Sequence, residues 1–252
     1  MEMAKSYAKE IHQNFAKLYA NWLPNEAIVL GDFGYLKDGI FNKEGNLKEL
    51  FRGIEIHEAS PNPLAPPAWY KYTSASTQII EVSPQAQAKV NEFADINARL
   101  EIKFSNKNSV FFNAPGCVFK SIDNLPNFKE KIINLYNIGH WKAEYVIVTK
   151  LLQATSATII ISASNNSSIT LEAEGKTTID LADVNLTFKA KSENNIGFKL
   201  TTESDIIPLV GFHKLKKGFF GLGSLTVDTE YESTIDRVEK EWDLIEVDDV
   251  IE

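Results

Sequence analysis

Apolar residues recur at helical spacing near the beginning of the chain. The recurring positions, three or four residues apart, are Tyr7, Ile11, Phe15, Leu18 and Trp22. Residues spaced in this way share one face of an α-helix. The pattern therefore predicts an amphipathic helix over residues 3–22, ended by Pro24. We expect it to pack on the body of the protein; a helix lying on a membrane surface is the alternative, because its polar face carries lysines.

Glycine and proline divide the next part of the chain into short segments. Residues 27–41 predict two short strands joined at the sequence KDG, and a second turn is predicted at residues 43–46. Residues 60–68, SPNPLAPPA, hold four of the nine prolines and form the clearest break in the chain. A strand is predicted after it at residues 69–73, and Ser83-Pro84 predicts the start of a short helix.

The middle of the chain predicts strands and a second helix. Apolar and polar residues alternate over residues 96–104, which is typical of a half-buried strand. The sequence SNKN at 105–108 predicts the turn into the next strand, and NAPGCVF predicts that Cys117 lies at a turn. Residues 124–138 have the spacing of a second amphipathic helix.

The second half of the sequence is rich in strand candidates separated by turn signals. These candidates are residues 145–151, 157–162, 168–174, 177–181, 184–191 and 196–200. The order of elements predicts an α+β fold: a twisted antiparallel β-sheet with an N-terminal helix and one or two further packing helices. We expect a single domain over residues 1–226, followed by a distinct C-terminal segment, residues 227–252.

Composition narrows the class of protein. The chain has 252 residues, of which 44% are hydrophobic and 24% charged, and this excludes wholesale disorder. No apolar run reaches the length of a transmembrane helix, and the first twenty residues lack the apolar centre of a signal peptide. Cys117 is the single cysteine, which rules out an intramolecular disulfide and suits a reducing compartment. We therefore expect a cytoplasmic protein.

The negative charge is concentrated in the C-terminal segment. Residues 227–252 hold eleven acidic and two basic residues, a net charge of −9, whereas the whole chain has −8. Acidic terminal segments are often interaction tails. This segment also contains apolar residues, so we expect it to dock on a surface, either as a last helix or strand or as a detachable acidic lid. The candidate masking residues are Trp242, Leu244, Ile245 and Val247.

A basic and aromatic stretch precedes this acidic segment. Residues 210–225, VGFHKLKKGFFGLGSL, combine lysines with aromatic residues. Lysines beside exposed aromatic residues are typical of proteins that bind anionic membranes; a last strand with its lysines in water is the simpler alternative. The candidate membrane-contact residues are Lys214, Lys216, Lys217, Phe219 and Phe220. The chain has only three arginines and a nearly neutral body, so we expect no nucleic-acid partner.

Signals for catalysis are weak. The four histidines are isolated and lack metal-ligand spacing, so we expect neither a metal nor a cofactor. The sequence GDFG lacks the spacing of phosphate-binding loops. If the protein is an enzyme, Cys117, His57 and Asp32 are the first residues to test, although a buried structural thiol is the simpler role for Cys117.

The order of these features resembles that of the pore-forming domain of the gasdermin family. Shared features are a basic helix at the start, a twisted antiparallel sheet, and a helix before a long strand, here residues 144–162. The resemblance covers roughly residues 125–252. It implies that amphipathic segments, here 159–174 and 184–200, rearrange into membrane hairpins. It also implies that proteolysis releases a short C-terminal segment, a role that the acidic tail would fill.

The chain departs from that family in two places. Bacterial gasdermins, which are about this size, carry an acylated cysteine near the N-terminus, where this chain has Glu2 and Met3. The segment VLGDFGYLKDGIFNKEGNL matches no part of the family.

Three functions remain open at this point. The first is a non-enzymatic, membrane-perturbing effector of cellular defence, masked by its C-terminal segment and able to form a homo-oligomer. The second is a soluble α+β binding module whose C-terminal segment docks a protein partner. The third is an enzyme with an unrecognised site. Removal of residues 227–252 discriminates among them, since it predicts membrane leakage for the first and a lost complex for the second.

Overall fold

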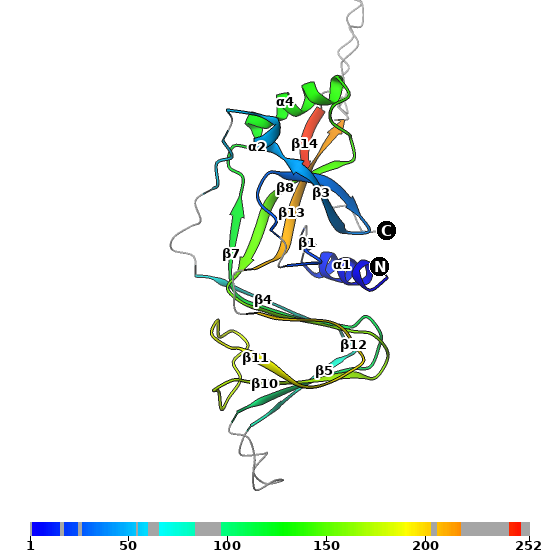
Figure 1. Ribbon diagram of the computed structural model, residues 1–252, viewed down its shortest axis with the longest axis vertical. Coiled ribbons are helices and arrows are strands. Elements are labelled where there is room, and N and C mark those ends of the chain that lie inside the picture. The colour runs from blue at the N-terminus through cyan, green and yellow to red at the C-terminus, as the bar shows by residue number, and fades with distance from the viewer. Residues whose placement is uncertain are drawn as a thin grey trace, which may run out of the picture.

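The fold is α+β and mostly antiparallel sheet, in a computed structural model (Figure 1). It describes residues 2–15, 18–24, 27–53, 55–59, 66–83, 97–202, 206–217 and 242–247. The described helices are α1 (Glu2–Asn14), α2 (Leu47–Leu50) and α4 (Pro126–Asn137). The described strands are β1 (Tyr19–Ala20), β2 (Asp32–Lys37), β3 (Ile40–Asn46), β4 (Ala68–Thr73), β5 (Thr77–Val82), β6 (Arg99–Phe104), β7 (Val110–Ser121), β8 (Tyr145–Ala154), β9 (Ala157–Ser162), β10 (Ser167–Ala173), β11 (Phe188–Asn194), β12 (Ile196–Thr202), β13 (Ile206–Lys217) and β14 (Trp242–Glu246).

The larger of two sheets runs through the whole molecule. Its strand order is β1-β13-β8-β7-β9-β12, with β14 beside β13, β2 and β3 beside β8, and β4 beside β7. In Figure 1, β8 and β13 run along the long axis in the upper part, whereas β4 and β12 run across the lower part. The sheet therefore changes direction between an upper and a lower half.

The change of direction occurs within β7 and between β8 and β9. A register shift opposite β4 marks a β-bulge near Gly116, which has a φ of +65°. A Cβ atom there would lie 2.5 Å from Thr155 Oγ1 and 2.8 Å from Val184 Cγ1, so only glycine fits. Cys117 therefore lies in a bulged strand and not at a turn before a strand, which corrects the sequence prediction.

A smaller sheet, β11-β10-β6-β5, packs under the lower half of the larger one. Between the two sheets lies a core of Leu100, Ile102, Phe104, Phe111, Ile160, Ile169 and Leu171. The other face of β7 and β9 packs against α1, which lies in the angle between the halves (Figure 1). Because β9 is covered on both faces, all six of its residues are buried.

The N-terminal helix is shorter than its apolar spacing predicts. It ends at Asn14, and Tyr19–Ala20 pair as a strand with Val210 and Leu209 of β13. The prediction of a helix to residue 22 was therefore wrong, because tertiary strand pairing overrides local periodicity here. The helix does pack on the body, with Tyr7 and Ile11 almost fully buried.

Several other predicted boundaries changed. The turn expected at residues 43–46 is the end of β3, where the pairing with β2 contains a bulge. No regular strand forms at residues 177–181, and β11 begins at Phe188 rather than at residue 184. β5 was not predicted, because its sequence TQIIEV lacks clean alternation. The helix expected from residue 83 falls mostly outside the described residues.

Candidate functional site

The lysine-bearing stretch forms the end of β13, a strand that crosses the upper half of the molecule. Phe212 and Leu215 point into the core, with exposed fractions of 0% and 3%. Lys214 is half-buried and Lys216 is exposed. As the simpler alternative expects, Phe212 enters the core and the described lysines keep contact with water; β13 is not the last strand, however, because β14 follows it. The description of β13 ends at Lys217, so Phe219 and Phe220 lie outside the described residues.

The acidic C-terminal segment supplies a strand that pairs with this stretch. β14 is antiparallel to β13, and Lys216 stands opposite Asp243 while His213 stands opposite Glu246. Lys217 is paired with Trp242 and Lys214 with Ile245. Basic positions of one strand therefore meet acidic and apolar positions of the other in a single register.

Apolar side chains and a backbone hydrogen bond support this pairing. Leu215 and Leu244 are opposite each other and share a cluster with Phe128 and Ile132 of α4. Val247, just beyond β14, is 3% exposed, and its backbone N–H donates a 2.8 Å hydrogen bond to the Phe212 carbonyl. The segment expected to dock is therefore docked, by strand pairing and by two buried or half-buried side chains.

A second feature is a continuous pairing register in the lower half. β6 and β7 follow each other along one stretch of chain, and they pair with β10 and β9 of another. In all these pairs, and in the pairs of β7 with β8, the two residue numbers add up to 271. The two sheets of the lower half are thus one long antiparallel ribbon, folded over at the turns between the strands.

The side chains of this ribbon alternate as though it were extended. On the stretch 100–114 the even-numbered strand residues are apolar, namely Leu100, Ile102, Phe104, Val110, Phe112 and Ala114. Their opposites are mainly apolar, including Ile159, Ile161, Ile169 and Leu171. The intervening strand positions are polar except for the facing pair Phe111 and Ile160, which fills the core between the two sheets. Extended, the ribbon would have one apolar and one polar face.

The folds in the ribbon are made by asparagines. Asn108, Asn166 and Asn195 each lie in a turn between the two sheets and have φ values of 60°, 58° and 55°. Asparagine tolerates this left-handed conformation better than other residues except glycine. It also accepts extended geometry, so these turns are compatible with both a folded and an extended chain.

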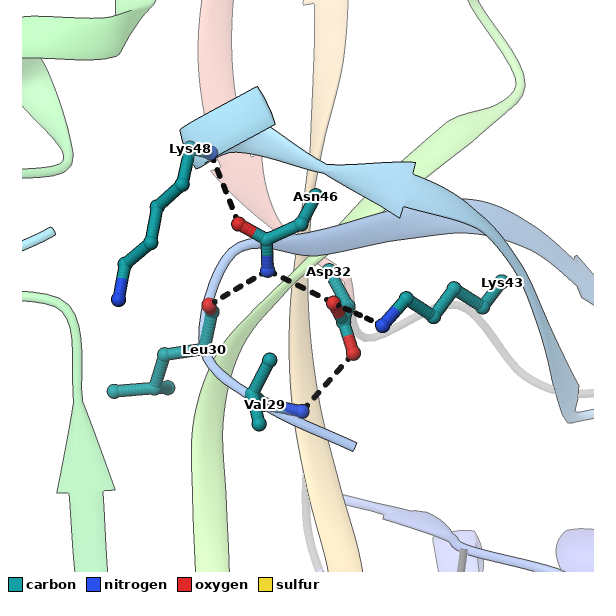
Figure 2. Close-up of polar contacts among 6 residues, drawn as sticks. All are labelled: Val29, Leu30, Asp32, Lys43, Asn46 and Lys48. Atoms are coloured by element: carbon teal, nitrogen blue, oxygen red, sulfur yellow. Dashed lines mark hydrogen bonds and ion pairs between the residues drawn. The ribbon is translucent and has the colours of Figure 1, made fainter. Parts of the chain in front are cut away.

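Asp32 has a structural role at the start of β2 (Figure 2). Its side chain is fully buried. Oδ1 accepts a 2.8 Å hydrogen bond from Asn46 Nδ2 and forms a 2.8 Å ion pair with Lys43 Nζ. Oδ2 accepts a 3.0 Å hydrogen bond from the backbone N–H of Val29. Asn46 also caps α2 by accepting a hydrogen bond from Lys48 N at 2.9 Å. The carboxylate thus ties the segment before β2 to the hairpin that follows.

The other two enzymatic candidates lie in different surroundings. Cys117 is 3% exposed, and burial raises the pKa of its thiol to about 12, which disfavours the reactive thiolate. Its Sγ donates a 3.1 Å hydrogen bond to the Ala114 carbonyl. His57 is exposed on the segment before the proline-rich crossing. Among the described residues, Cys117, His57 and Asp32 each bond to other groups and not to one another.

One cavity of about 340 Å³ lies at the other end of β13, beside Ile207. Its wall includes Leu30 and Leu151, and an ion pair between Lys120 and Glu58, at 3.5 Å, stands at its edge. Within the described ranges, no cluster of three potential metal ligands occurs. None of the described helices is long and apolar enough to cross a membrane.

No protein-family model matches the sequence, and no curated protein matches it.

Proposed function

We propose that the protein is a non-enzymatic, membrane-perturbing effector whose folded ribbon opens into membrane-spanning hairpins after β14 leaves β13. The observation that carries the proposal is the single register of the ribbon together with its alternation of apolar and polar positions, which the facing pair Phe111 and Ile160 interrupts within the described strands β6, β7, β9 and β10. A soluble β-sandwich does not require the register or the alternation to continue through its turns, because each strand only has to direct apolar residues toward the core between the sheets.

Strand length supports this proposal. A transmembrane β-strand requires about 9–11 residues. β6 has 6 residues and β10 has 7, so neither is long enough alone. Joined in the same register to β7 and β9, each becomes part of a strand that exceeds this length. β11 and β12 extend the same alternation, with Phe188, Ala190, Ile196, Phe198 and Leu200 on even positions.

The pairing of β14 with β13 supports the masking part of the proposal. Lys214 and Lys216 lie on the strand edge that β14 occupies, next to the acidic positions of the tail. Lysines near an anionic membrane contribute about 1 kcal/mol each to binding. Acidic residues beside them oppose that attraction, so departure of the tail would raise affinity for anionic lipid.

Several chains would be needed for a pore. Outer-membrane-type barrels have at least eight strands, and each chain offers few long amphipathic ones. We therefore expect a homo-oligomer that assembles on the cytoplasmic side of the membrane. No cofactor is required for this activity.

A cleavable form of the full chain tests the proposal. A specific protease site is inserted between residues 229 and 233, and dye release from anionic and neutral liposomes is followed before and after cleavage. We expect release from anionic vesicles only after cleavage. A cleaved protein that stays folded by circular dichroism and leaves both vesicle types intact would overturn the proposal.

A further inference from the structure

The edge of β13 that carries the lysines is occupied by a replaceable strand. On its other side β13 pairs with β8 along most of its length, from Ile206 to Lys214. On this side, β1 covers Leu209 and Val210, and β14 covers residues 213–217. Among the described strands, β14 alone satisfies the backbone of this end of the edge.

β14 is a short strand of the larger sheet. It has 5 residues and pairs with a single described strand, β13. Of the two side chains that the structure describes in this segment, Leu244 is half-buried and Val247 is buried. Burial of one such side chain stabilises by about 1.5–3 kcal/mol. A competing strand that makes one or two better contacts can therefore replace β14.

We propose that residues 213–217 of β13 form a strand-addition site for an extended acidic segment of a protein partner, which displaces β14. This inference rests on the proposed function, because displacement is its trigger. The site accepts a strand antiparallel to β13, with an apolar residue opposite Leu215 and acidic residues opposite Lys216 and His213. β14 itself shows this chemistry in its register with β13.

A protein strand fits this edge better than a lipid does. When β14 leaves, the backbone N–H and C=O groups that alternate residues of 213–217 direct to this edge lose their partners. Lipid tails cannot satisfy such groups, whereas an added strand satisfies all of them at once. Main-chain hydrogen bonds give such a site its affinity, and the alternate side chains give it specificity. Here Leu215 and the lysines of β13 would select an apolar residue flanked by acids.

β14 competes with any partner strand for this site, because β14 is attached to the same chain. Tethered segments commonly act at an effective concentration in the millimolar range. A free copy of β14 should therefore bind only weakly, and a variant with a weakened β14 should bind it more tightly. Leu244→Asp is suitable for this purpose, because it removes the apolar residue opposite Leu215.

Peptide binding to the full chain tests this inference. The probe is a fluorescein-labelled peptide of residues 240–248, KEWDLIEVD, followed by fluorescence anisotropy. A peptide of the same composition in scrambled order is the control. We expect saturable binding to the Leu244→Asp chain, at least tenfold tighter than that of the scrambled peptide. We also expect loss of binding when β14 is locked by an oxidised Lys216→Cys/Asp243→Cys pair, with recovery on reduction.

The outcomes separate this inference from the proposed function. The inference is wrong if the Leu244→Asp chain remains folded and shows no preference for the peptide up to millimolar concentration. It is also wrong if the locked chain binds equally well. Dye release by the cleavable chain together with such a result would leave the proposed function standing. Peptide binding at β13 without dye release would establish the site and overturn the proposed function.

Discussion

At the scale of single residues, buried polar groups hold local structure. Asp32 is the clearest example, because its carboxylate receives three polar contacts from three other residues and is fully buried (Figure 2). The sequence made Asp32 one of the first residues to test for an enzyme; in the structure its carboxylate links the segment before β2 to the β2–β3 hairpin.

Replacement of Asp32 tests this structural role. Asp32→Ala leaves the Val29 N–H and the Asn46 amide without their acceptor, so we expect a loss of about 3 kcal/mol in the free energy of unfolding. Urea denaturation measures it. Glu101→Gln, which removes a half-exposed ion pair with Lys103, is the control and should change stability by less than about 0.5 kcal/mol. Equal effects of the two substitutions would contradict the assigned role.

Cys117 gives a prediction for the dependence of stability on pH. The thiol has its ordinary pKa of 9.0 in the unfolded chain, and burial raises its pKa to about 12 in the fold. Its contribution to stability is therefore complete below pH 9 and is lost as the pH rises toward 12. Between pH 8 and 10.5, we expect the wild type to lose about 1–2 kcal/mol more than Cys117→Ala. An identical loss in both proteins, measured by urea denaturation, would show that the thiol is not buried.

At the scale of elements, local residue patterns predicted several strands and helices, whereas strand pairings between distant parts of the chain could not be predicted. Regular alternation located β6 and β12, and helical spacing located α4 within two residues of its ends. The strand at Tyr19 could not be predicted, because its partner on β13 is distant in sequence. The charge and apolar content of the C-terminal segment predicted that it docks. The pairing of β14 with β13 could not be predicted, because the register depends on tertiary structure. The proline-rich crossing and the residues beyond Lys217 fall largely outside the described part.

The ribbon also yields a prediction that distinguishes the folded from the opened form. Ile160 and Ile161 are both fully buried in the fold. In an extended hairpin, Ile160 would lie on the polar face and Ile161 on the apolar face. In a Cys117→Ala background, we expect a water-soluble maleimide to modify Ile160→Cys but not Ile161→Cys once the cleaved protein is on liposomes.

Protection before cleavage is the internal control for that experiment. Both cysteines should resist modification in the uncleaved chain, because the core covers them. Equal labelling of the two positions on liposomes would mean that the segment unfolds without forming a strand.

At the scale of the whole molecule, the negative charge is concentrated in the tail, residues 227–252, whereas the body is nearly neutral. The tail of −9 meets the lysines of β13 through β14, the one part of the tail that the structure describes in pairing. Under the proposed function, this pairing offsets the attraction of the lysines for anionic surfaces.

Substitution of those lysines should weaken membrane binding of the cleaved protein. Lys214→Gln with Lys216→Gln removes about 2 kcal/mol of attraction, so we expect at least a tenfold fall in partition to anionic vesicles at low salt. Lys131→Gln, an exposed position of α4, is the matched control and should have little effect. The difference should shrink at high salt because exposed charges are screened. Vesicle co-sedimentation measures both; an equal effect of the control would argue against a role for β13.

The central claim is that β14 on β13 keeps the ribbon closed, and a reversible lock tests it most directly. The cleavable chain carries Lys216→Cys and Asp243→Cys, two positions that stand opposite each other, in the Cys117→Ala background. Dye release from anionic liposomes is measured after cleavage, first oxidised and then reduced. The account predicts no release while the disulfide holds and release once it is reduced. Release from the oxidised form, or none from a reduced form that remains folded, would contradict it.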